Sequence, residues 1–264
     1  MELFYSESGN KSEKPIVFIH GAGVASWMWN KQVEFFQDQF YCLTVDLPGH
    51  GKSISEEYVS TRACSEKIID IIEERVNGKK VILVGFSLGG QIVVDILSIR
   101  PDLVESALIN SCVIKPLKFL NFIIPLMTKW SMPLAKNRKF ARLQAKYMYI
   151  GDEDFEKYYE DSKHITAKTF STLMIGYFNY KLVDSFKQMT VPSLVLVGSK
   201  EPGMIKKSLI ALVKSNPNCK GYIVPRVSHG ISLARPELFN DILAAWINKQ
   251  PLPQEIYEYI AGCW

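Results

Sequence analysis

Residues 81–91 read VILVGFSLGGQ, an apolar run that ends at a serine with one glycine two places before it and another two places after it. The β-branched and apolar residues predict a buried strand, and the residues that follow Ser87 predict a helix. A sharp turn between the two would hold Ser87 in a sparsely populated backbone conformation, while Gly85 and Gly89 let neighbouring backbones approach. We therefore expect the Ser87 hydroxyl above the carboxyl end of a sheet, where open α/β sheets bind ligands.

The composition bounds the class of protein. The chain has 264 residues, 47% of them hydrophobic and 22% charged, which fits one large globular domain or a core domain with an insertion. The net charge is only +4, so nucleic acid is not an expected partner. The sequence has no secretory signal pattern and no apolar stretch of membrane-spanning length, which predicts a cytoplasmic protein. The dispersed cysteines lack the spacing of a metal site and are expected to be free thiols: Cys42, Cys64, Cys112, Cys219 and Cys263.

Short apolar runs alternate with longer amphipathic segments, which predicts an α/β fold with a mostly parallel central sheet and helices on both faces. Strands are predicted over residues 15–20, 41–47, 80–86, 104–110, 191–197 and 221–225. Helices are predicted over residues 26–39, 60–76, 87–99, 204–214 and 236–249, with Ser60 or Thr61 as N-cap of the second. Residues 115–189 are helical in composition and contain no convincing strand. The expected organisation is a core domain at 1–114 and 190–264 with a helical cap at 115–189.

A serine nucleophile requires a base, and the base requires a group that orients it. His229 follows the last predicted strand and is expected at the same edge of the sheet as Ser87, so it is the best candidate base. Glu201 follows the preceding strand and could accept a hydrogen bond from the other imidazole nitrogen. His20 and His50 precede Ser87 and are expected to brace glycine-rich turns. Asp46 is expected to stabilise a turn, and His164 is expected to lie on an exposed helix face.

Five motifs follow one another along the chain: HGAG at 20–23, DLPGHGKS at 46–53, GFSLGG at 85–90, VPSLVLVGSKEP at 191–202 and SHG at 228–230. With the order Ser87, Glu201, His229, they make the chain resemble the α/β-hydrolase superfamily. The resemblance covers nearly the whole chain and lies with the branch that carries a helical cap between the sixth and seventh strands of the family's numbering. It implies the α/β-hydrolase fold.

The resemblance also implies an oxyanion hole formed by the backbone N–H groups of Ala22 and Leu88. The sequence departs from the family at one point, because most relatives have aspartate where this chain has Glu201. Some relatives carry the acid directly after the sixth strand of the family's numbering. This chain has Asn110 and Ser111 there, and neither side chain ionises. Glu201 is therefore the predicted acid, with Asp184 as a distant alternative.

Information on the substrate has to come from the cap. Its apolar side chains either line a pocket above Ser87 or dock the cap onto the core. The predicted substrate-binding residues are Phe122, Met127, Trp130, Met174 and Phe178. The cap begins basic and turns acidic at Asp152. Such a stretch can lie on an anionic membrane. A solvated cap face is the more common arrangement, so membrane contact is the minor alternative.

Together these features predict a serine hydrolase of the carboxylesterase or lipase type that needs no cofactor. Its substrate would be a small apolar carboxylic ester, thioester or lactone, cleaved through a Ser-His-Glu triad and an acyl-enzyme. Because the histidine must be neutral to act as base, activity is expected to fall below roughly pH 6 to 7. Two alternatives stay open: a cofactor-free lyase or synthase of the same superfamily, such as the menaquinone-pathway synthase, and a ligand-binding sensor or signalling protein with incidental hydrolysis. The sequence does not indicate an oligomeric state.

Overall fold

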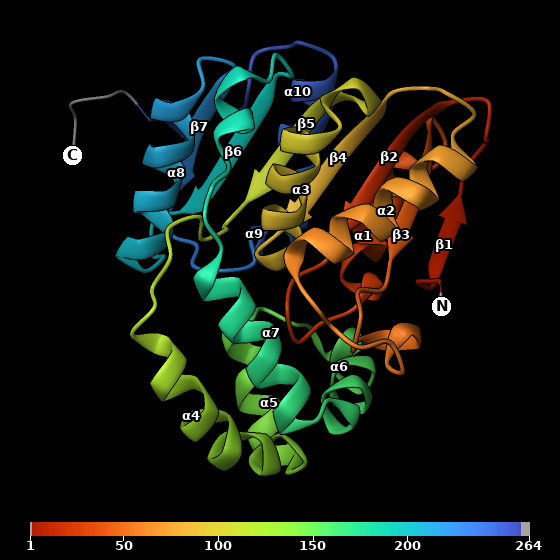
Figure 1. The fold of residues 1–264 in the computed structure, drawn as a ribbon. Coiled ribbons are helices and arrows are strands. Elements are labelled where there is room, and N and C mark those ends of the chain that lie inside the picture. The colour runs from red at the N-terminus through yellow and green to blue at the C-terminus, as the bar shows by residue number, and fades with distance from the viewer. Residues whose placement is uncertain (1, 260–264) are drawn as a thin grey trace.

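The computed structural model describes residues 2–259. Its strands are β1 (Tyr5–Ser8), β2 (Lys14–Ile19), β3 (Phe40–Val45), β4 (Val81–Phe86), β5 (Val104–Asn110), β6 (Ser193–Gly198), β7 (Cys219–Val224) and β8 (Tyr257–Glu258). Over the described residues these eight strands form one sheet in the order β1-β3-β2-β4-β5-β6-β7-β8 (Figure 1). β1 and β8 pair antiparallel at the two edges, and the strands between them are parallel. The mostly parallel central sheet of the prediction is confirmed.

The six predicted strands are found within two residues of their predicted ends. They were readable because a strand buried on both faces is a continuous apolar run, as in β4, where every residue is buried. β1 and β8 were not predicted. They are four and two residues long and partly or fully exposed, so they lack such a run.

Helices cover both faces of the sheet, as predicted (Figure 1). α2 (Thr61–Arg75), α3 (Leu88–Ile99) and α8 (Gly203–Ser215) pack in one apolar cluster, and α1 (Asn30–Phe36), α9 (Ile231–Ala234) and α10 (Pro236–Ile247) pack in the other. Ser60 caps α2 by accepting a hydrogen bond from the Ala63 amide at 3.1 Å. The single helix predicted over 26–39 is instead a 3-10 turn, Ser26–Trp29, followed by α1.

Two glycines of the GFSLGG motif allow α3 to lie directly on the sheet. A Cβ atom on Gly89 would lie 2.1 Å from the carbonyl oxygen of Ile19 in β2. A Cβ atom on Gly85 would lie 2.3 Å from the carbonyl oxygen of Gly89. Both distances are far shorter than real contacts, so larger residues would push the helix off the strands.

Four α-helices of the described residues follow β5 and precede β6: α4 (Leu120–Ala135), α5 (Arg138–Tyr147), α6 (Asp152–His164) and α7 (Ala167–Asn179). They gather beneath the carboxyl edge of the sheet (Figure 1). α7 is tied to the core by the buried Gln91 of α3, whose side-chain amide donates to the carbonyl oxygens of Tyr177, at 2.8 Å, and Val113. Among residues 2–259, no helix combines the length and apolarity needed to cross a bilayer.

Candidate active site

Ser87 lies at the bend between β4 and α3 in the strained conformation that the sequence predicted. Its φ of 55° is in the left-handed region, which non-glycine residues rarely adopt. Its backbone N–H donates to the carbonyl oxygen of Asn110 at 2.8 Å, which fixes the bend against β5. The tertiary structure therefore stabilises a local strain that presents one hydroxyl at the carboxyl edge of the sheet.

The structure brings Glu201 and His229 into contact. The His229 Nδ1 atom lies 3.1 Å from Glu201 Oε2. The Glu201 side chain is fully buried, whereas 28% of the His229 side chain is exposed. With Nδ1–H donating to the carboxylate, Nε2 is the nitrogen free to accept a proton. The imidazole packs on Phe86, the residue before Ser87, with ring centroids 4.6 Å apart.

Ser111 is a functional candidate that the sequence reasoning set aside. It lies at the end of β5, fully buried and with a φ of 58°. Its hydroxyl donates to Glu201 Oε1, which also accepts from the Gly198 amide at 3.3 Å. Ser111 cannot ionise, but it holds the carboxylate of Glu201, the candidate acid, from the other position that the family uses. Its place directly after β5, the strand next to β6, is the feature of the sequence that could have indicated a supporting role for Ser111.

Tyr177 of α7 is a second candidate, which the sequence analysis did not single out. Its hydroxyl accepts a hydrogen bond from the Val113 amide at 3.1 Å. Burial raises the pKa of the Tyr177 phenol well above its ordinary value, while hydrogen bonds with the Ser87 side chain and the Val113 amide act in the opposite direction. A residue of the helical segment therefore lies near the candidate nucleophile, a relation that spacing in the sequence could not indicate.

The loop that contains Ala22 passes beside Ser87. A Cβ atom on Gly21 would lie 3.1 Å from the Cβ of Ser87. Leu88, the other predicted oxyanion donor, is the first residue of α3 and is buried. Free N–H groups at a helix N-terminus favour negative charge, which agrees with the role predicted for the Leu88 N–H.

His20 and His50 brace this loop, as expected. Nδ1 of His20 donates to the Gly21 carbonyl at 2.7 Å, and its Nε2 accepts from the Leu47 amide at 2.9 Å. His50 accepts from the Gly23 amide at 3.0 Å. Burial lowers the pKa of His50 to about 3, with the neighbouring His20 acting in the same direction, and burial also lowers the pKa of His20.

The other polar candidates are placed as follows. Asp46 stabilises a turn by accepting from the amides of Ser26, at 2.8 Å, and Lys52, at 2.9 Å. His164 is exposed on α6. Asp184 is also exposed and pairs with Lys187, so it is not in contact with His229.

A cavity of about 640 Å³ opens beside His229. Ala22, Gly23 and His229 line it from the sheet side. The helices α4 to α7 supply most of the remaining lining, which includes Met132, Leu143, Tyr147, Met148, Tyr158 and Phe170. The mixture of apolar walls and one imidazole is typical of a small-molecule site.

None of the five residues predicted to bind substrate lines this cavity. Phe122, Met127 and Trp130 lie on the exposed side of α4, and 86% of Phe122 and 71% of Trp130 are exposed. Met174 and Phe178 pack against the apolar core. The difference arises because α4 is apolar on two sides, and the sequence does not say which side meets the core.

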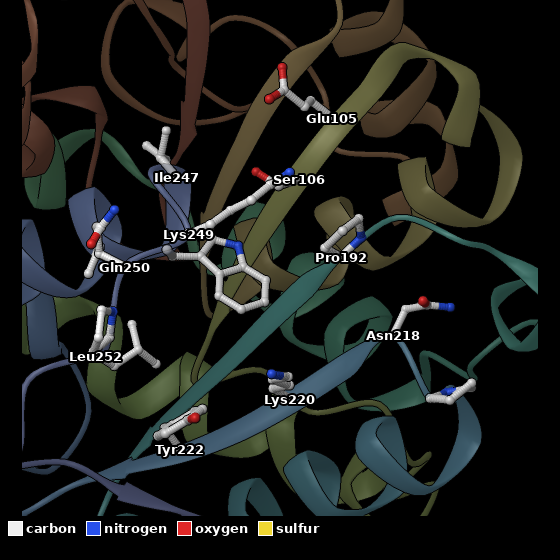
Figure 2. Close-up of a pocket in the computed structure, with 14 residues that line it drawn as sticks. Glu105, Ser106, Pro192, Asn218, Lys220, Tyr222, Ile247, Lys249, Gln250 and Leu252 are labelled. Atoms are coloured by element: carbon white, nitrogen blue, oxygen red, sulfur yellow. The ribbon is translucent and has the colours of Figure 1, made fainter.

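A second cavity, of about 580 Å³, lies at the opposite edge of the sheet (Figure 2). Glu105 and Ser106 at the start of β5, Pro192 before β6 and Asn218 before β7 line it. Because Ser87, Glu201 and His229 follow the carboxyl ends of their strands, this cavity is remote from them.

Within residues 2–259, no group of three or more His, Cys, Asp or Glu side chains is arranged to hold a metal ion. The cysteines of this range are free and buried: Cys42, Cys64, Cys112 and Cys219. Burial raises the pKa of each of these thiols to about 12, so they stay protonated. Cys263 lies outside the described residues.

Comparison with known proteins agrees with this architecture. The model of the Alpha/beta hydrolase family matches residues 16–242. The chain is 24% identical to the (E)-2-((N-methylformamido)methylene)succinate hydrolase of Acinetobacter baylyi, over 94% of each chain. It is 28% identical to the pimeloyl-[acyl-carrier protein] methyl ester esterase of Wigglesworthia glossinidia brevipalpis, over 89% of this chain and 93% of that one. A thermophilic esterase from Thermogutta terrifontis superposes with a TM-score of 0.78 at 17% identity, covering 94% of this chain and 93% of that one, which shows a shared fold.

Proposed function

The chain belongs to the alpha/beta hydrolase family and is an enzyme, and from this premise we propose that it cleaves a small apolar carboxylic ester, thioester or lactone. Ser87 is the nucleophile, His229 the general base and Glu201 the acid that orients the base. The observation that carries the proposal is the contact of 3.1 Å between His229 Nδ1 and the buried carboxylate of Glu201. The same imidazole packs on Phe86, the residue before a serine held at a positive φ.

In the proposed reaction, Ser87 Oγ attacks the substrate carbonyl while His229 Nε2 takes its proton. Glu201 stabilises the imidazolium that forms. The N–H groups of Ala22 and Leu88 hold the oxyanion, each donor being worth about 3 to 4 kcal/mol. His229 then gives the proton to the leaving alcohol, and a water molecule repeats the attack on the acyl-enzyme.

The cavity supports the substrate class. Its volume of about 640 Å³ and its apolar lining fit a small acyl or alcohol group, with His229 at one side. We also propose that residues 115–189 are a cap over a core formed by 1–114 and 190–264. The position of α4 to α7 between β5 and β6, and a cavity lined from both parts, support that division.

A fluorophosphonate label followed by a series of 4-nitrophenyl esters of increasing chain length tests the proposal. We expect the label on Ser87 and turnover of the shorter esters. Ser87→Ala should lose the label and lower kcat/KM at least about a thousandfold. Ser98→Ala, a buried serine at the far end of α3, is the matched control and should keep both.

Two outcomes would contradict the hydrolase proposal. Labelling of Ser87 without turnover of any ester would favour the lyase or synthase alternative, or the sensor. A complete absence of labelling would show that Ser87 is not an activated nucleophile.

A further inference from the structure

The outward side of α4 is apolar along its length. Large side chains recur there at the spacing of one helix face, and all are exposed; we call them the outer stripe: Phe119, Phe122, Ile123, Leu126, Met127, Trp130 and Leu134. The inward side of the same helix is buried at Ile124, Thr128 and Ala135. A helix on the surface of a soluble domain normally turns polar residues to water, so the outer stripe lacks its expected environment.

The segment that carries the outer stripe is rich in positive charge. Residues 115–150 contain eight Lys and Arg and no Asp or Glu. Arg138 and Arg142 pair with Glu156 and Asp152 of α6. In the part of the chain that the structure describes, the other basic side chains of this stretch form no ion pair, and all are exposed: Lys115, Lys118, Lys129, Lys136, Lys139 and Lys146.

A second copy of the chain is a poor partner for this surface. A two-fold interface sets the same patch against itself, and here it would bring unpaired lysines toward lysines. An anionic bilayer satisfies both features, because its surface attracts lysines and its acyl region accepts large apolar side chains. α4 lies at the outer edge of the molecule (Figure 1), so a flat bilayer can reach it without any matching hollow.

We propose that the outer stripe and its lysines dock the protein on an anionic lipid bilayer. The cavity of about 640 Å³ beside His229 is lined partly by α4, the helix of the outer stripe, and partly by α5. Two of its lining residues on α5, Leu143 and Tyr147, are 66% and 71% exposed. If the proposed function holds, an apolar ester can enter from the lipid side. The docking itself is independent of hydrolysis and is measured without substrate.

The test is co-sedimentation of the full chain with vesicles of equal parts phosphatidylglycerol and phosphatidylcholine, compared with vesicles of phosphatidylcholine alone. We expect binding to the anionic vesicles that weakens as salt is added. Phe122→Ser combined with Trp130→Ser should lower the partition coefficient at least about tenfold. Lys118→Gln combined with Lys129→Gln should lower it about fivefold for each lysine. Phe35→Ser, on the exposed part of α1, is the matched control and should bind as the parent does.

Circular dichroism verifies that each variant is folded. The parent's tryptophan emission should also shift to the blue on anionic vesicles, and Trp130→Phe should remove the shift while keeping most of the binding. The proposal is overturned if the parent does not sediment with anionic vesicles at low salt, or if Phe35→Ser loses as much binding as the outer-stripe variant. A parent dimer in sedimentation velocity that the outer-stripe variant converts to monomer would also overturn it, because a second copy would then cover the stripe.

Discussion

Glu201 is a buried carboxylate with three hydrogen-bond partners: Ser111, Gly198 and His229. Glu201→Gln keeps the shape but removes the charge that, in the proposed mechanism, stabilises the imidazolium and fixes its tautomer. We expect kcat to fall by about a thousandfold to ten-thousandfold, as for comparable triad changes. Glu201→Asp keeps the charge but shortens the side chain, so it should retain more activity than the glutamine variant. Steady-state turnover of the best 4-nitrophenyl ester measures both.

Glu237→Gln is the control for this change, since Glu237 is exposed in the first turn of α10. It should leave kcat unchanged. A Glu201→Gln enzyme with parental kcat would exclude Glu201 as the acid.

Tyr177 of α7 lies near the candidate nucleophile, and its hydroxyl accepts a hydrogen bond from the buried amide of Val113. Tyr177→Phe leaves that amide without an acceptor, which should lower the free energy of unfolding by about 1 to 3 kcal/mol. Loss of the phenol hydroxyl near Ser87 should also lower kcat/KM by about tenfold. Urea unfolding and steady-state kinetics measure the two effects.

Tyr147→Phe is the matched substitution at an exposed tyrosine. It should change the free energy of unfolding by less than about 0.5 kcal/mol. Equal stability of the two variants would mean that the Val113 amide finds another partner.

At the scale of the element, the contact between α3 and β2 depends on Gly89. A Cβ atom there would lie 2.1 Å from a backbone oxygen, which cannot move as a side-chain tip can. Gly89→Ala is therefore expected to destabilise the fold by more than about 3 kcal/mol or to prevent soluble expression. Urea unfolding of the purified variant, or its yield in the soluble fraction, measures the effect.

Gly203→Ala supplies the comparison, because a Cβ atom at this first residue of α8 meets nothing within 4 Å. It should be neutral or stabilise the protein by up to about 1 kcal/mol. A Gly89→Ala protein as stable as the parent would show that α3 can move away from the sheet at little cost.

At the scale of the whole molecule, His20 and His50 make stability depend on pH. Both are buried with lowered pKa values, that of His50 being about 3, while an unfolded histidine titrates near about 6.5. The unfolded chain therefore binds more protons as pH falls below that value. Stability should be constant above about pH 7 and decrease below about pH 6.5, by up to about 1.4 kcal/mol per pH unit for each histidine. Urea unfolding between pH 8 and pH 5 measures this slope.

His50→Asn removes one of the two groups and should roughly halve the slope, even though the variant is less stable at every pH. His164→Asn, at an exposed histidine, should leave the slope at the parental value. An unchanged slope in His50→Asn would mean that His50 is not the group that titrates on unfolding.

The sequence by itself determined the parallel strands, the strand, turn and helix around Ser87, and the order of the candidate catalytic residues. Those features follow from neighbours in the chain: a doubly buried strand is an apolar run, and a tight bend requires glycines beside it. The edge strands β1 and β8 were not predicted, because they are defined by pairing with a neighbouring strand rather than by burial.

Only the tertiary structure decided which residues support the candidate triad and which line the cavity. Ser111 and Glu201 are 90 residues apart in the chain, and Tyr177 approaches Ser87 from a different segment. The apolar side chains of residues 115–189 were expected to line a pocket or to dock on the core. Ile124 of α4 is buried, yet Phe122 and Trp130 on the other side of that helix are exposed. The sequence could not distinguish these two sides of α4, because apolarity shows only that a side chain is stabilised by leaving water. Which surface the side chain contacts depends on how the elements pack.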